Sequence, residues 1–465
     1  MATRIEADSL GEIEVPVSAL WGAQTQRSLQ NFPIGHEKMP PELIRAFAIV
    51  KMAAAETNHA LGKLDDERCQ WIESACREIL NGDHYDQFPL VIWQTGSGTQ
   101  SNMNANEVIA NRANELAGAE RGSKEPVHPN DHVNMSQSSN DFFPTAMHVA
   151  AACSIQSHLL PKIEEIIHSF KRKAQEFQDI TKIGRTHMMD ATPLTLGQEI
   201  SGYIAQLQFA EQHIREAQKG LFDLALGGTA VGTGLNSHPA WASQVAHNVA
   251  VYTNLPFDTA DNKFMALSAH DALLKTSGAL RQLASACMNI GNNIRLLASG
   301  PRCGLGELLL PANEPGSSIM PGKVNPTQCE ALTMVAAQVM GNDAAVAIAC
   351  SQGHLQLNVF KPVIIHNVLQ SIQLLSDVCD SFAKRCVDGM QANREVIDSH
   401  LNRSLMLVTA LSPMLGYDLS ADIAKQAFDE NKTLKEVILE KKLLTETEFD
   451  QAMDPAKMTG EKAPR

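Results

Sequence analysis

The chain has 465 residues and a formal charge of −14, and only 5% of its residues are aromatic. An acidic chain without a basic stripe is not typical of proteins that bind nucleic acid or anionic membranes, so we expect neither partner. The length allows two or three domains, and the abundance of small and aliphatic residues favours a mainly helical core over a sandwich or barrel.

Nine cysteines are scattered along the chain, and no two form a CxxC pair. Their odd number and spacing predict reduced thiols, with no disulfide framework, metal site or iron–sulfur cluster. The N-terminus lacks an apolar signal core, so we expect a cytoplasmic location. We expect no apolar run of membrane length, because residues 344–360 lack charged groups but contain several polar ones.

The first predicted domain, residues 1–137, is mixed and mostly helical. Residues 11–17 alternate like a short strand. Further along, Gly96 and Gly98 predict a turn, and a helix is expected to begin near Thr99 to Ser101. Asn102 lies on the same face of this helix as Asn106, which suggests hydrogen bonding. The alternative is that these Ser, Thr and Asn residues only cap the helix.

The second predicted domain, residues 138–394, opens with four capping residue types, and Pro144 fits the first turn of the helix that they begin. These residues are Ser138, Ser139, Asn140 and Asp141. Because a helix N-terminus carries free amides and a partial positive charge, it suits a carboxylate. Plain capping is again the alternative.

Long helical patterns follow in this domain. Residues 155–177 form an amphipathic pattern in which Pro161 marks a bend or a start. Residues 331–342 and 363–375 carry almost no charge on any face. Such helices must be surrounded by others, which predicts subunits that share a helical bundle. We place His187 in a polar turn between helices, where one histidine among 16 selects no function by itself.

Residues 316–326 read Gly-Ser-Ser-Ile-Met-Pro-Gly-Lys-Val-Asn-Pro. The glycines and prolines exclude regular helix, so this is a shaped loop. Lys323 and Asn325 are two residues apart, so their side chains lie on the same side of the loop if it is extended. From that side both can reach one carboxylate. A surface linker is the alternative. The last predicted domain, residues 395–465, contains two capping boxes, Thr433 to Glu436 and Thr445 to Glu448.

Together these motifs resemble the fumarase/aspartase superfamily, with the loop 316–326 as its signature. Residues 95–99, 138–140 and 186–187 match its other regions in order and approximate spacing. Residues 21–35 and Gly322 resemble class II fumarase more than aspartase. The resemblance covers essentially the whole chain. It implies three mostly helical domains, a twenty-helix core in a homotetramer, and active sites built from three subunits.

The resemblance further implies reversible hydration of fumarate to (S)-malate, a step of the tricarboxylic acid cycle, without metal or organic cofactor. Ser317 is then the carbon base, His187 the acid/base at oxygen, Glu330 its orienting partner, and Lys323 a stabiliser of the enediolate-like charge. The residues expected to bind the dicarboxylate are Ser97, Gly98, Thr99, Asn102, Ser138, Ser139, Asn140, Thr186, Ser318 and Asn325.

A second dicarboxylate site of this family corresponds here to His128, Pro129, Asn130 and Asp131, with adventitious binding as the alternative. Two other functions stay open. An aspartate ammonia lyase on the same scaffold shares the proton-abstraction step, and the superfamily has also produced an inactive structural homologue. The intact Ser317, His187, Lys323 and Glu330 disfavour the inactive form.

Overall fold

The computed structural model describes residues 2–460 of the chain. The chain divides into two compact units. The first unit comprises Met1–Pro161, Gln212–Ala284 and Ala337–Ser376, and the second comprises Lys162–Glu211, Ser285–Ala336 and Asp377–Arg465. The three domains expected from the sequence stay a prediction, and residues 1 and 461–465 of its outer domains lie outside the described residues.

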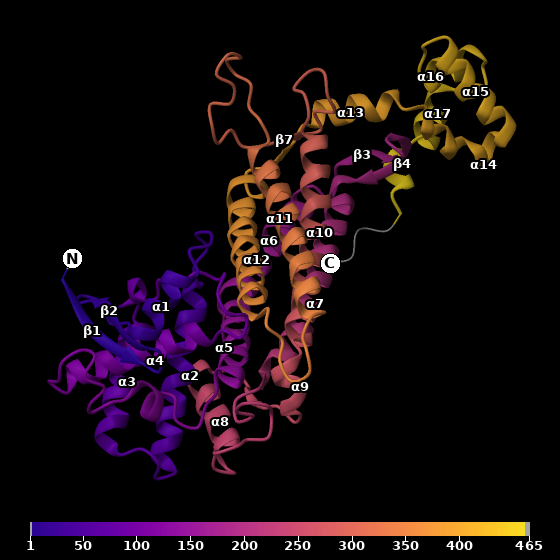
Figure 1. Ribbon diagram of the computed structural model, residues 1–465. Coiled ribbons are helices and arrows are strands. Elements are labelled where there is room, and N and C mark those ends of the chain that lie inside the picture. Colours follow the sequence, from indigo (N-terminus) through magenta and orange to yellow (C-terminus); the bar gives the residue numbers. More distant parts are fainter. Residues whose placement is uncertain (1, 461–465) are drawn as a thin grey trace. The chain divides into compact units, whose positions relative to one another are not determined.

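The first unit is mainly helical and contains two short two-stranded sheets, of which the pair β1 (Thr3–Asp8) and β2 (Gly11–Pro16) lies near the N-terminus (Figure 1). Its other strands are β5 (Asp223–Leu224) and β6 (Asp258–Thr259). Its helices are α1 (Ala23–Asn31), α2 (Pro41–Ala60), α3 (Asp66–Leu80), α4 (Thr99–Leu116), α5 (Ser139–Ser154), α8 (Trp241–Thr253) and α9 (Lys263–Ser268). β2 confirms the strand predicted over residues 11–17, and α4 begins where the sequence predicts.

Helix α2 lies at the centre of the first unit, because most of its residues are apolar and buried on every side. Phe47 of α2 packs on Phe142 and Phe143 of α5, with ring centroids 5.3 and 5.8 Å apart. Each such buried aromatic ring contributes on the order of 2–3 kcal/mol from apolar burial. This packing fixes the first turn of α5 against α2.

Five long helices have residues in both units: α6 (Leu160–Glu176), α7 (Leu196–Gln218), α10 (Asp271–Leu297), α11 (Thr327–Cys350) and α12 (Lys361–Phe382). The uncharged stretches 331–342 and 363–375 lie within α11 and α12, as predicted. The pattern over residues 155–177 begins with a π-helical turn, η3 (Ile155–Leu159), and continues as α6. Pro161 is the second residue of α6, so it marks the start of the α-helical part.

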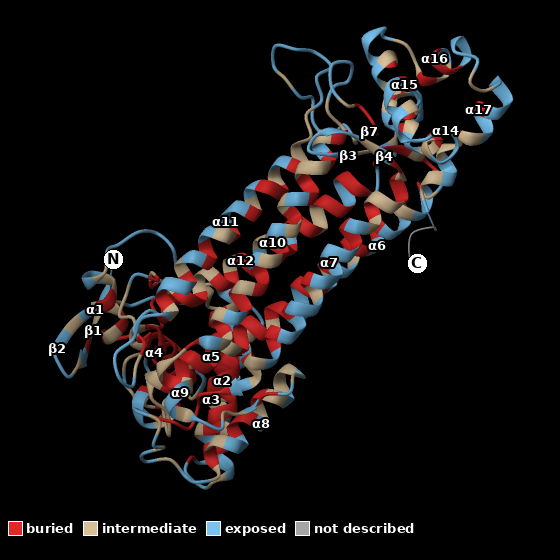
Figure 2. Cartoon of the chain, turned by 90° about the vertical axis from the view of Figure 1, so that its right-hand side faces the viewer, coloured by how far each residue is buried: buried red, intermediate tan, exposed pale blue. Residues whose placement is uncertain are grey.

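Helix α11 corrects one expectation, because its 24 residues are long and apolar enough to cross a membrane by length and composition. The charge-free run of residues 344–360 begins inside α11 and so includes only the C-terminal end of this apolar helix. Only 39% of the apolar stretch is buried, and Met334 and Ile348 are exposed. Figure 2 shows buried, intermediate and exposed residues along α11. Asp343 nevertheless accepts hydrogen bonds from Ser277 and Arg281 of α10, which is the pattern of a bundle helix.

The second unit contains two antiparallel strand pairs and a small helical end. Its strands are β3 (Thr181–Thr186), β4 (Met189–Thr195), β7 (Leu308–Leu309) and β8 (Gln391–Ala392). Its helices are α13 (Arg394–Arg403), α14 (Ser412–Leu415), α15 (Tyr417–Asp429), α16 (Leu434–Glu440) and α17 (Glu446–Ala452). Both predicted capping boxes are present at the starts of α16 and α17. The described part is thus mainly helical, as the sequence predicts.

Candidate active site

The N-terminus of α4 places three of the predicted binding residues in one turn. Gly98 has φ +79°, and a Cβ there would meet the Phe143 ring at 2.3 Å. Gly96 is equally constrained, since its Cβ would lie 1.4 Å from the carbonyl oxygen of Val359. The two glycines therefore let this turn approach α5 and the segment before α12. Within the turn, the Ser97 and Thr99 hydroxyls are 2.8 Å apart.

Two predicted binding residues from different helices are joined directly. Asn102 of α4 donates its amide hydrogens to the Ser139 hydroxyl at 2.9 Å and to the Asn134 side-chain oxygen at 3.1 Å. Asn102 is buried, and Ser139 is the first residue of α5. The predicted face of polar residues on α4 therefore meets the N-terminus of α5.

A capping box begins α5, as the sequence indicates. Asp141 accepts from the Ser138 amide at 2.9 Å and also from the amides of Gly227 and Thr229 at 3.0 and 2.7 Å. Burial raises the pKa of Asp141 to about 6, although these amides and the charge of Lys51 oppose that shift. Asp141 thus fixes the start of α5 to the glycine-rich segment after β5.

Pro144 lies in the second turn of α5, not in the first as the sequence suggested. Because proline has no amide hydrogen, the carbonyl of Asn140, four residues earlier, loses its helical partner. Lys361 lies within 3.4 Å of this carbonyl and donates to it, although Lys361 is fully buried. The Asn140 side chain in turn donates to the carbonyl of Ala230 at 2.8 Å. Pro144 therefore opens a site for a buried lysine at the predicted binding turn.

The signature loop of residues 316–326 is irregular between β7 and α11, as predicted. Gly316 has φ +80°, and a Cβ there would lie 1.6 Å from the Lys323 carbonyl oxygen, so the loop closes on itself only with glycine. The Ser317 hydroxyl oxygen accepts from the amides of Ile319 and Met320 at 3.3 and 3.2 Å. Lys323 donates to the side-chain oxygen of Asn325 at 2.6 Å, which confirms that they share a side.

The structure corrects the environment of His187, which lies at the tip of a β-hairpin and not between helices. Strands β3 and β4 pair antiparallel on either side of the turn, as their β-branched residues favour. His187 and Met188 have φ +56° and +65°, the combination of a type I′ turn that normally takes Asn or Gly. Backbone strain of this kind concentrates at functional sites, so it supports a role for His187.

A buried carboxylate, Glu307, anchors this hairpin. The sequence did not predict this role. Glu307, fully buried, contacts Arg185 at 2.7 Å, Lys182 at 3.1 Å and His400 at 3.1 Å. Burial alone raises the pKa of Glu307, but the Arg185 hydrogen bond and the Lys182 charge outweigh it and hold the pKa below its ordinary value. No local pattern marks Glu307, because its partners are more than 90 residues away.

Five other predicted catalytic or binding residues of the second unit are exposed. Thr186 and His187 are at the hairpin tip, Ser318 and Lys323 are in the loop, and Glu330 is in the first turn of α11. Within residues 2–460, no hydrogen bond or ion pair joins the side chains of His187 and Glu330. Their expected pairing therefore stays a prediction.

The predicted second dicarboxylate site forms a π-helical turn, η2 (Pro129–Val133). His128 Nδ1 accepts from the amides of Asn130 and Asp131 at 3.2 Å each, so the ring carries its hydrogen at Nε2. His128, Pro129 and Asn130 line a cavity of about 370 Å³, and Asp131 is exposed beside it. Three carboxylates, Glu6, Asp8 and Glu107, also line this cavity together with Lys124, so acidic side chains outnumber the lysine there. Binding of a second dicarboxylate here stays a prediction.

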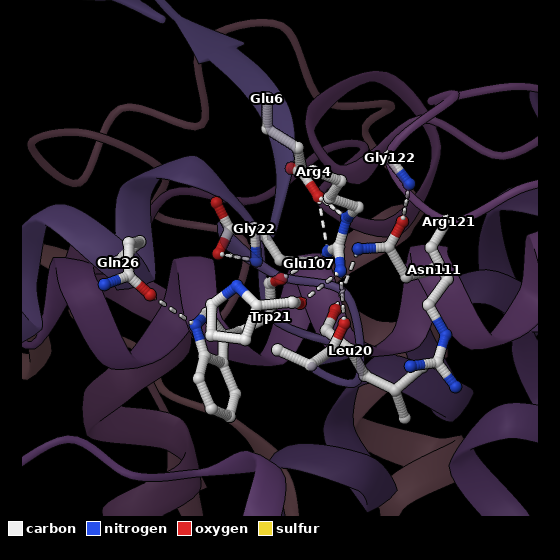
Figure 3. A network of polar contacts seen from close by, with 12 residues as sticks. Arg4, Glu6, Leu20, Trp21, Gly22, Gln26, Glu107, Asn111, Arg121 and Gly122 are labelled. Carbon is white, nitrogen blue, oxygen red and sulfur yellow. Dashed lines mark hydrogen bonds and ion pairs between the residues drawn. The ribbon is translucent and has the colours of Figure 1, made fainter. Parts of the chain in front are cut away.

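Segment 21–35, which resembles class II fumarase in sequence, is held by α4 (Figure 3). Glu107 accepts from the amides of Gly22 and Gln24 at 2.9 Å and from the Thr25 hydroxyl at 2.6 Å. Burial raises the pKa of Glu107, against those hydrogen bonds. Glu107 thus caps the start of α1 and fixes α4, the helix that carries Asn102.

All nine cysteines are free. Within the described residues, no three His, Cys, Asp or Glu side chains gather as a metal site would require. Independence from metals and cofactors stays a prediction.

Comparison with known proteins identifies the family. Residues 11–341 match the family described as lyase, and residues 407–460 match the fumarase C C-terminus. The chain is therefore a helical lyase. It is 60% identical over 460 residues to the class II fumarate hydratase of Thermosynechococcus vestitus, covering 99% of this chain and 98% of the relative.

The class II fumarate hydratase of Helicobacter pylori is 58% identical over 463 residues, which span 100% of both chains. A crystal structure of class II fumarase from Schistosoma mansoni superposes with a TM-score of 0.96 at 47% identity and covers 99% of each chain. The chain belongs to the class II fumarate hydratase family. This result confirms the resemblance and the mainly helical, fumarase/aspartase-like fold class, and it does not favour the two alternative functions.

Proposed function

We propose that this chain catalyses the reversible hydration of fumarate to (S)-malate, as a homotetramer whose active sites combine residues of different subunits. One observation carries the proposal. The loop of residues 316–326 presents the Ser317 oxygen to two backbone amides, with Lys323 and Asn325 hydrogen-bonded to each other in the same loop. A proton-abstracting oxygen, amide donors and a cation are the parts that the elimination half-reaction requires.

In the elimination direction, from malate to fumarate, Ser317 takes the proton from the carbon next to one carboxylate. Hydrogen bonds from the Ile319 and Met320 amides favour the anionic form of the Ser317 oxygen and lower the cost of this step. The electrons move onto that carboxylate, and Lys323 and Asn325 stabilise the enediolate-like charge. His187 then protonates the departing hydroxide, with Glu330 as its orienting partner.

The other carboxylate binds at the start of α5, where the cap of Ser138 and the amides of the first turn face an anion. Ser97, Thr99, Ser139, Asn140 and Thr186 complete the donors, and Asn102 holds Ser139 in place by a hydrogen bond. Because two carboxylates are recognised by separate sets of donors, the site selects a dicarboxylate of fixed length.

The exposure of the catalytic candidates supports the assembly. An enediolate in bulk water gains little from a nearby lysine, because water screens the charge. Thr186, His187, Lys323 and Glu330 are all exposed in the single chain, so another subunit must cover them. The exposed apolar residues of α11 offer a surface for that subunit.

The test is a paired assay on the purified protein together with its native mass. We expect fumarate absorbance to rise with malate and not with aspartate, and the mass to be four times that of the chain. Turnover of aspartate alone would assign the ammonia lyase reaction instead. Full activity in a monomer would overturn the shared site. Cytoplasmic location stays a prediction.

A further inference from the structure

Lys51 of α2 is a buried cation directly behind the predicted dicarboxylate turn. Its side chain is fully buried, and its ammonium group donates to the side-chain oxygens of Asn102 at 2.8 Å and of Asn134 and Gln137 at 3.0 Å. The same nitrogen lies 3.9 Å from the centre of the Phe142 ring. All four partners are electron-rich, and none carries a charge.

The hydrogen bonds around Lys51 require its charged form. The amide nitrogens of Asn102, Asn134 and Gln137 all donate elsewhere, so the three amide oxygens must face Lys51. Three oxygens need three donors, which an ammonium has and a neutral amine lacks. Burial lowers the pKa of Lys51 well below its ordinary value, and the nearby charge of Asp141 opposes that shift. The three oxygen acceptors around the nitrogen favour the charged form.

The nearby anion does not neutralise Lys51 by contact. Asp141 directs its oxygens to the backbone amides of Ser138, Gly227 and Thr229. A buried charge without a contacting counter-ion is destabilising, and an apolar residue of the same length would avoid that cost. The presence of Lys51 is explained if its charge acts on an anion that binds at the surface above it.

A chain of hydrogen bonds leads from Lys51 to that surface. Lys51 donates to Asn102, and Asn102 donates to the Ser139 hydroxyl oxygen at 2.9 Å. Because Ser139 accepts on this side, its hydroxyl hydrogen points elsewhere, and no acceptor for it lies within residues 2–460. Polarisation along such a chain strengthens each following donor.

We propose that Lys51 is a positioning residue for dicarboxylate binding, which holds Ser139 as an outward hydrogen-bond donor and supplies positive potential to the start of α5. The inference rests on the proposed function and names a residue outside its binding set. Lys51 acts on the carboxylate that does not take up the developing charge, so its effect falls on binding more than on turnover.

The experiment uses the full assembled enzyme and two inhibitors, succinate and succinamate, which differ by one negative charge. Lys51→Met is expected to raise the KM for fumarate and the inhibition constant of succinate by roughly tenfold, the effect of losing one charge-assisted interaction, with kcat nearly unchanged. The inhibition constant of succinamate, which can place its neutral amide at Ser139, should rise less. Lys51→Arg keeps the charge and should keep the preference for succinate.

The matched control is Lys173→Met, which removes another buried lysine, paired with Glu176 at 2.8 Å and outside the predicted site. Neither inhibition constant should change in this control. Lys51→Gln, which keeps two donors without the charge, replaces Lys51→Met if the latter does not assemble. The losses of succinate affinity from Lys51→Met and Ser139→Ala should be less than additive in the double variant. Both substitutions act through the same hydrogen bond, the one that the Ser139 hydroxyl donates to the carboxylate.

If Lys51→Met weakens the binding of succinate and succinamate equally, the role of Lys51 is overturned while the proposed function stands. Fully additive losses of affinity in the double variant would have the same consequence. A wild-type protein that does not convert malate would overturn both.

Discussion

The two sets of predicted site residues are held in place differently, one by hydrogen bonds between side chains and the other by the backbone. At the start of α5, Asn102 is buried, and it links Ser139 to Lys51 by hydrogen bonds shorter than 3 Å. In the signature loop and the hairpin tip, Lys323 and His187 are exposed, and the backbone itself is constrained at Gly316 and His187. In the proposed site, hydrogen bonds within the single chain therefore hold the dicarboxylate donors in place. The proposed acid/base groups are fixed by local backbone geometry, and in the proposed assembly another subunit covers them.

The largest effect is expected from Ser317→Ala, which removes the proposed carbon base. The kcat should fall roughly 10²- to 10⁴-fold, the usual contribution of general base catalysis, with the native mass unchanged. Ser318→Ala is the matched control, because it removes the neighbouring hydroxyl but keeps the Ser318 backbone amide available to bind the substrate, and kcat should fall far less. Equal losses in the two variants, measured by fumarate absorbance, would remove Ser317 from the base role.

His187→Asn separates chemistry from backbone strain, because Asn tolerates the left-handed φ of this turn. We expect kcat to fall roughly 10²-fold with little change in melting temperature. Met188→Asn, at the neighbouring left-handed position, should keep wild-type kcat. If both variants lose activity alike, the turn geometry matters and the imidazole does not.

Glu307→Gln tests the anchor of the hairpin. Removing the charge that Lys182 and Arg185 share should destabilise the protein by about 3–5 kcal/mol at neutral pH, seen as a lower melting temperature. The pKa of Glu307 lies below its ordinary value of 4.5, so its stabilisation is present above that pH and is lost as the pH falls through the folded-state pKa. The difference between variant and wild type should therefore shrink in acid. A constant difference would contradict the ionised carboxylate as the anchor.

A smaller contrast is expected between two glycines of the signature loop with nearly equal φ, +80° at Gly316 and +81° at Gly322. Gly316→Ala also brings its Cβ to 1.6 Å from the Lys323 carbonyl, while a Cβ at Gly322 meets open space. Gly322→Ala should lower the free energy of unfolding only by the cost of a left-handed backbone at a residue with a Cβ, about 1–2 kcal/mol. Gly316→Ala should lose more activity through a displaced Ser317. Equal kcat values would show that loop closure is not required.

The sequence alone determined the helical class, the strand of residues 11–17, the start of α4, both C-terminal capping boxes and the irregular signature loop. All of these depend on neighbours a few residues apart: helical periodicity, capping side chains, and the backbone limits of glycine and proline. The family resemblance rests on such local motifs as well, and it is confirmed.

Only the tertiary structure decided where the long-range partners lie. It placed His187 on a hairpin, put Glu307 against Lys182 and Arg185, and set Pro144 in the second turn of α5. It also enclosed Lys51 among amides from distant segments. A buried charge is stable only when packing brings its partners together, and no pattern of neighbouring residues records which distant partners those are.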